Sequence, residues 1–94
     1  MIRIHPLEVK VRLRRILLSR FVAAHPDSPF QAPGHDGLPI LVHRCQLRAE
    51  RTWRVTYFDK RGPAGHCYAS DYRDAVRLAS GEFAADLSKA EFTQ

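Results

Sequence analysis

Residues 52–59 constrain the fold most, because their side chains alternate between two sets as those of a half-buried strand do. One set is Trp53, Val55 and Tyr57, and the other is Arg54, Thr56 and Phe58. Aromatic and β-branched residues are favoured in strands, and such an alternation places one set on each face of a sheet. We therefore predict a strand whose first set packs inward and whose second set faces outward.

Two further strands are expected nearby in the sequence. Residues 40–48 are rich in apolar side chains, and residues 66–69 form a shorter strand pattern. Between the second and third strands, residues 60–65 hold two glycines and a proline, which is typical of a hairpin loop. Because strands joined by short connections pair as antiparallel neighbours, we predict a three-stranded antiparallel sheet over residues 40–69.

A basic helix is predicted before the sheet, at residues 6–24. Pro6 suits the first helical position, and apolar residues then recur at helical spacing. The apolar stripe is Val9, Leu13, Ile16, Leu17, Phe21 and Ala24, and the bases on the other side are Lys10, Arg12, Arg14, Arg15 and Arg20. Residues 9–13 also alternate as a strand would, so a strand is the alternative for the first half. The next stretch, residues 25–39, contains four prolines and two glycines and is predicted to be a loop.

A second helical segment is predicted after the sheet, at residues 70–92. Ser70 or Asp71 can cap its start, and Gly81 can break or kink it. The stripe expected to pack inward is Tyr72, Ala75, Val76, Ala79 and Phe83. With 94 residues, the chain fits a single domain, residues 1–94. The expected fold class is α+β: an N-terminal helix, a three-stranded antiparallel sheet and a C-terminal helix packed on one sheet face.

The other sheet face is expected to be open to solvent and to carry a mixture of cations and aromatic rings. The outward residues of the second and third strands are Arg54, Thr56, Phe58, His66 and Tyr68, and those turned inward include Cys67 and Ala69. For the first strand, we expect Leu41, Cys45 and Leu47 to face inward and Arg44, Gln46 and Arg48 to face outward. A slip of one residue in any strand exchanges the two sets.

The distribution of charge favours a polyanionic partner near the front of the chain. Lys and Arg outnumber Asp and Glu by 15 to 10, and residues 1–24 carry six bases against one acid. Such a patch is suited to nucleic acid or to an acidic protein surface, although a solvated basic face gives the same count.

The segment Trp53-Arg-Val-Thr-Tyr-Phe-Asp, the glycines at 62 and 65, Tyr68-Ala-Ser and Asp74-Ala75 resemble the three-strand-plus-helix DNA-binding modules of integrase arms and AP2-type domains of mobile elements. The resemblance covers about residues 44–80 and implies a sheet laid in the major groove of DNA, with Arg54, Thr56 and Phe58 facing the groove. The N-terminal helix departs from that pattern. Double-stranded-RNA-binding domains share the order of elements, but Asp71 and Asp74 stand where that family has phosphate-binding lysines.

Other kinds of site have weaker support in the sequence. His43 and Cys45 with His66 and Cys67 are suitable zinc ligands, but alternation turns His66 and Cys67 to opposite faces, so no metal is expected. No motif for nucleophilic catalysis or for a phosphate-binding glycine loop is present, so we expect neither an enzyme nor a cofactor. With no apolar run of about 18 residues and no secretion signal, the expected location is the cytoplasm, with both cysteines reduced.

Two functions follow as hypotheses. The first is a small DNA-binding accessory or regulatory protein, as found in phages and mobile elements, acting as a monomer or homodimer; RNA is the alternative nucleic acid. Its expected contact residues are Arg12, Arg14, Arg15, Arg44, Arg48, Arg54, Thr56, Phe58, Lys60, Arg61 and Tyr68. The second is a protein-binding inhibitor or adaptor, such as a phage antagonist of a host defence complex. It would use the basic surface or insert Phe30 from the Pro-rich loop as a hot spot.

Overall fold

The computed structural model describes residues 6–47 and 50–93, with side chains for residues 15–46 and 52–93. Helix α1 (Pro6–Ala24) is followed by strands β1 (Phe30–Pro33), β2 (Pro39–Leu47), β3 (Glu50–Asp59) and β4 (Gly62–Ala69). Helix α2 (Tyr72–Gly81), the short 3-10 helix η1 (Leu87–Lys89) and strand β5 (Glu91–Phe92) complete the described chain. The fold is α+β, with two α-helices and one antiparallel sheet of five strands in the order β4-β3-β2-β1-β5.

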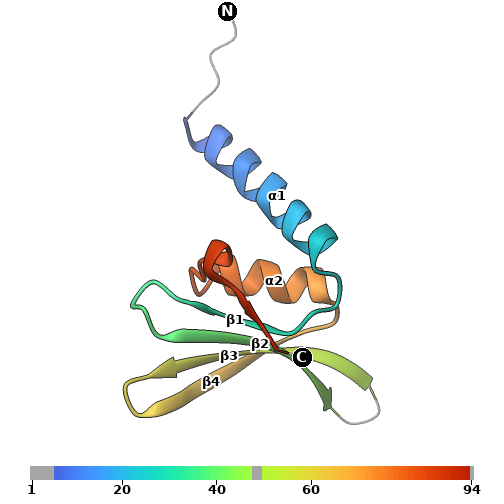
Figure 1. The fold of residues 1–94 in the computed structure, drawn as a ribbon, viewed down its shortest axis with the longest axis vertical. Coiled ribbons are helices and arrows are strands. Elements are labelled where there is room, and N and C mark those ends of the chain that lie inside the picture. The colour runs from blue at the N-terminus through green and yellow to red at the C-terminus, as the bar shows by residue number, and fades with distance from the viewer. Residues whose placement is uncertain (1–5, 48–49, 94) are drawn as a thin grey trace, which may run out of the picture.

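The sheet is covered on one side only. Figure 1 shows α2 and η1 lying over one face, α1 rising obliquely from beside the N-terminal end of α2, and no described element below the other face. Helix α2 packs through Tyr72, Ala75, Val76 and Ala79, all buried. Its small alanines let the helix approach the sheet closely, over a core that includes Val42, Val55, Trp53 and Phe30. The inward stripe predicted for this helix is confirmed up to Ala79, and Phe83 is half-buried.

Two segments differ from the sequence prediction at the edge of the sheet. The stretch 25–39 is not wholly a loop, because residues 30–33 form β1 and pair with β2. This strand has only four residues and ends in Pro33. Its alternating pattern consists of two buried residues, Phe30 and Ala32, which is too short to indicate a strand in the sequence. Phe30 is 2% exposed, so it lies in the core and cannot be inserted into a partner as a hot spot.

The C-terminal segment is not one helix over residues 70–92. Asp71 caps α2 by accepting a hydrogen bond from the Asp74 N–H, and the helix ends at Gly81. Ala84 then takes a φ of 51°, which reverses the chain so that the Ala85 N–H donates to the carbonyl of Ala79. The remainder forms η1 and β5 instead of a further helical turn.

The β3–β4 hairpin is tighter than predicted. Asp59 pairs with Gly62, so only Lys60 and Arg61 form the turn, and β4 begins at Gly62 instead of His66. Gly62 has a φ of 128°, which favours glycine, and the Arg61 N–H donates to Asp59 Oδ1 at 2.7 Å. Pro63 is tolerated because β4 is an edge strand.

Helix α1 has the predicted limits, and Phe21 of the predicted stripe packs inward, but Ile16 and Leu17 do not. Leu18 is buried, with Phe21 and Val22 packed against the core, whereas Ile16 and Leu17 of the predicted inward stripe are 47% and 60% exposed. Apolar residues lie on several sides of this helix, so their spacing alone does not show which side packs on the body. Only its C-terminal turns rest on the body, and the first half projects beyond it (Figure 1).

Candidate functional site

The uncovered sheet face is the candidate site, and register places its side chains in cross-strand rows. One row is His43, Arg54 and Tyr68, and the next is Leu41, Thr56 and His66. The outward placement predicted for Arg54, Thr56, His66 and Tyr68 is therefore confirmed. We call the surface formed by His43, Arg54, Thr56, His66 and Tyr68 the open sheet face.

Strand β2 has the opposite phase from the one predicted. Ile40 and Val42 pair with Tyr57 and Val55 on the covered side, which places Arg44 and Gln46 on that side as well. Leu41 and Cys45, predicted to face inward, lie on the open side. The run Ile40-Leu41-Val42 has no alternation, so the pattern does not determine its phase; pairing with β3 does.

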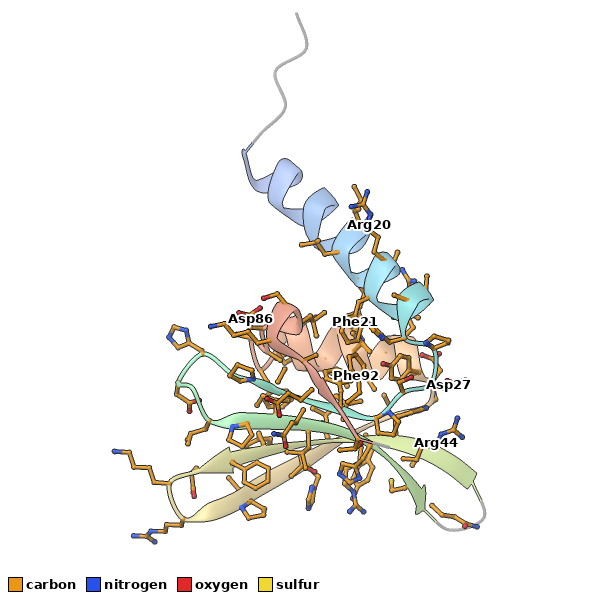
Figure 2. All side chains as sticks on the ribbon, in the orientation of Figure 1. Arg20, Phe21, Asp27, Arg44, Asp86 and Phe92 are labelled. Atoms are coloured by element: carbon orange, nitrogen blue, oxygen red, sulfur yellow. The ribbon has the colours of Figure 1, made fainter. Side chains whose placement is uncertain are left out.

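Arg44 is therefore separated from Arg54 by the sheet. Its guanidinium lies 5.0 Å from the Trp53 ring centroid and 3.9 Å from Asp27 Oδ2. Figure 2 shows Arg44 and Asp27 at the same end of the molecule. The prediction that Arg44 shares an outward surface with Arg54 is wrong.

At the centre of the open sheet face, a guanidinium lies against an exposed aromatic ring. Arg54 Cζ is 5.3 Å from the ring centroid of Tyr68, which is 44% exposed. Arg54 is half-buried, and its Nε is hidden without a hydrogen-bond partner in the described part of the chain. A cation–π contact of this kind restrains the guanidinium, and its terminal amino groups can donate to phosphate or to a base.

Beside this pair, Thr56 joins two imidazoles. Its Oγ1 lies 3.0 Å from His43 Nε2 and 2.9 Å from His66 Nδ1. A hydroxyl has one proton, so it can donate to only one ring nitrogen and must accept from any ring N–H facing it. Thr56 is only 4% exposed, so it orders its neighbours and is not free to meet a ligand.

The electrostatics of the face depend on Arg54 at neutral pH. Burial is the largest cause that lowers the pKa of His43 below its ordinary value. A hydrogen bond with the Arg44 backbone opposes this shift, and the nearby charges of Arg54 and His66 reinforce it. His43 is therefore neutral at neutral pH, and the guanidinium is the fixed positive charge of the described rows.

The remaining predicted contact residues fall into separate places. Phe58 is half-buried beyond a β-bulge and lines a small hollow with Tyr57 and Phe83. Lys60 and Arg61 are exposed at the hairpin tip, about 20 Å from Arg54 by strand length. Arg15 is exposed on α1, which lies on the covered side. Arg12 and Arg14 lie in α1, but their side chains are outside the described part of the structure. Arg48 lies outside the described residues.

The four residues weighed as zinc ligands do not converge. His66 is on the open side and Cys67 on the covered side, as alternation requires. Within residues 6–47 and 50–93, no three His, Cys, Asp or Glu side chains are grouped to hold a metal ion. Both cysteines are free thiols and half-buried. Among the helices described, none has the length and apolar character needed to cross a bilayer.

His43 is a further member of the open sheet face. It was not expected there, because strand β2 was predicted with its two faces exchanged.

Comparisons with protein families, with characterised proteins and with solved structures find no match for this chain.

Proposed function

We propose that this protein is a small accessory or regulatory protein that binds DNA through the open sheet face. The observation that carries the proposal is the Arg54–Tyr68 pair, a guanidinium held against an exposed ring on a face that no described helix covers. Aromatic rings accept unpaired bases by stacking, and arginine contacts phosphates and guanine edges. Tyr68 is the stacking residue and Arg54 the anion-binding residue in this proposal.

Single-stranded DNA suits the face better than a duplex groove. Among the described side chains, few cations line this face, and its one exposed ring offers more to an unstacked base than to a paired one. Lys60 and Arg61 are exposed at the hairpin tip, about 20 Å from Arg54 by strand length, where a longer single strand can reach them. If Arg54, Lys60 and Arg61 each neutralise one phosphate, log affinity falls with log salt with a slope of about −2 on a single strand.

Fluorescence anisotropy with a labelled oligothymidine and with a duplex of random sequence tests the proposal. Tyr68→Ala and Arg54→Lys are expected to weaken binding to the single strand about tenfold each, because one removes a stacking surface and the other the planar guanidinium. Arg77→Ala is the matched control, since this exposed arginine lies on α2, on the covered side. Circular dichroism verifies that each variant is folded.

Two outcomes overturn the proposal. One is the absence of binding to either nucleic acid at low salt. The other is equal affinity for the Tyr68, Arg54 and Arg77 variants, which would place any DNA contact elsewhere. Tighter binding to the duplex, with the same dependence on Arg54, would retain the site and change the ligand to paired DNA.

A further inference from the structure

An apolar groove lies on the other side of the molecule from the open sheet face. It is formed by the C-terminal half of α1, the end of α2 and the segment around η1, and it encloses about 730 Å³. The apolar residues that line it are Leu17, Leu18, Phe21, Ala24, Ala85 and Leu87. Figure 2 labels Arg20 on α1 and Asp86 beside η1, and both border the groove.

The helix that forms one wall of the groove is anchored at one end. The Phe21 ring lies 5.0 Å from Phe30, and the His25 ring stacks 4.1 Å from Phe92. Arg73 of α2 also donates to Ser19 Oγ at 3.3 Å. These contacts hold the end of α1 on the body, so the groove cannot close by a rotation of α1 without breaking the aromatic cluster.

The groove leaves apolar surface in water. Leu17 lies on the wall of the groove and is 60% exposed. Exposed apolar surface of this kind often marks a site where another molecule binds. A concave apolar surface beside a fixed helix matches the mode in which an amphipathic helix binds, with apolar residues at spacings of three and four directed into the groove. A volume of about 730 Å³ corresponds to roughly two turns of a helix about 10 Å wide.

Charge at the rim selects the kind of helix. Arg15, Arg20 and Arg77 are exposed around the groove, and Asp86 is the acidic residue that lines it. Arg77 is already paired with Asp74, with its Nε 3.4 Å from Asp74 Oδ1, so Arg15 and Arg20 carry the charge argument. Asp86 is already engaged, because it accepts hydrogen bonds from the Ser88 N–H and hydroxyl at 3.1 and 2.6 Å. The rim is therefore positive and complements carboxylates.

A second copy of α1 does not fit this rim. Residues 1–24 carry six bases against one acid, so the helix of another copy would bring like charges to Arg15 and Arg20. The occupant must instead be acidic on the flanks of its apolar stripe.

We propose that the groove binds an acidic amphipathic helix of a partner protein. Apolar residues of that helix contact Leu17, Leu18 and Phe21, and flanking Asp or Glu side chains pair with Arg15 and Arg20. With the DNA-binding face on the opposite side of the sheet, the chain is then an adaptor that holds both partners at once. The groove does not depend on the DNA proposal, since the two sites share no residue.

The test uses a display library of helical peptides about four turns long, with apolar residues at helical spacing and the other positions randomised. Selection on the wild-type protein is expected to enrich Asp and Glu beside the apolar stripe. The selected peptides are then synthesised, and their affinities are measured by fluorescence anisotropy. A version of each peptide with Lys in place of every acid is expected not to bind.

Variants locate the site. Leu17→Glu and Arg20→Glu are each expected to weaken peptide binding about tenfold or more, since one places a charge at the apolar wall and the other reverses the rim. Ile16→Glu is the matched control, because Ile16 is 47% exposed on the same helix but does not line the groove. Its affinity is expected to stay within about twofold of wild type.

Three outcomes overturn the proposal. The first is a selection that yields no peptide or yields basic ones. The second is equal binding to the Leu17, Arg20 and Ile16 variants. The third is sedimentation of the free protein as a dimer that Leu17→Glu converts to a monomer, which would make a second copy the occupant. Peptide binding is also measured for Tyr68→Ala. If this variant loses DNA binding and keeps peptide binding, the two proposals can fail independently of each other.

Discussion

Replacing Thr56 with valine removes the hydroxyl that joins two imidazoles and keeps the shape of the side chain. The hydroxyl lies 3.0 Å from His43 Nε2 and 2.9 Å from His66 Nδ1, and each such bond contributes about 0.5–1.5 kcal/mol net. Both rings border solvent, so water recovers part of this loss. We therefore expect Thr56→Val to lower the free energy of unfolding by about 1 kcal/mol, equivalent to a fall in Tm of about 4–8 °C.

Urea denaturation and thermal melting followed by circular dichroism measure the loss of stability. The ¹⁵N shifts of the imidazoles provide a second readout, because they report which ring nitrogen carries or accepts a proton. Thr56→Ser is the matched control: it retains the hydroxyl and is expected to leave these shifts in place, whereas Thr56→Val moves them. Wild-type stability together with unchanged imidazole shifts in Thr56→Val would refute the reasoning.

Three further predictions concern the fold and its titratable groups. Gly65→Ala is expected to cost about 1–3 kcal/mol in urea denaturation, because the new Cβ would overlap the Tyr57 ring. Gly81→Ala, which meets open space at the end of α2, should instead gain up to about 1 kcal/mol; equal effects of the two changes would contradict this. Because the pKa of His43 is lowered in the folded protein, the unfolded chain takes up a proton at His43 first as the pH falls. Stability is therefore expected to fall as the pH drops below 6.5, and a pH series of denaturation curves should show a smaller fall in His43→Gln. Burial raises the pKa of Tyr72 to about 12, so an ultraviolet titration should find one tyrosine that ionises there. Stability should decline as the pH rises from 10 through that value, and a Tyr72→Phe variant that left the titration unchanged would refute the assignment.

The sequence determined the elements that have a strong local period. Strand β3 could be predicted with both of its faces, because its alternation matches the pleat over six residues. Helix α2 could be predicted with its cap and its buried stripe for the same reason, since Asp71 and the alanines stand at helical positions. The limits of α1 were also predicted, although residues 9–13 fitted a strand as well.

The remaining features depend on tertiary contacts. Three consecutive apolar residues, Ile40 to Val42, fit either phase of β2, and only pairing with β3 directs Val42 inward. This single slip moved Arg44 to the wrong face and hid His43 from the predicted site. Strand β1 is held by pairing on both edges, which a four-residue segment that ends in proline does not reveal from its sequence.

The consequence for function is a smaller cationic site than the sequence predicted. Arg44 belongs to an edge contact with Trp53 and Asp27, and Thr56 serves as a bridge between histidines. What is retained is Arg54 with Tyr68, a pair suited to a base and a phosphate more than to a long stretch of duplex.

An amide NMR titration of the protein with oligothymidine tests most directly whether the open sheet face binds DNA. We expect the largest shift changes at Arg54, Tyr68 and His66 on the open sheet face, with smaller changes at Lys60 and Arg61. Largest changes confined to α1 and α2, with the β3 and β4 signals unmoved, would contradict it.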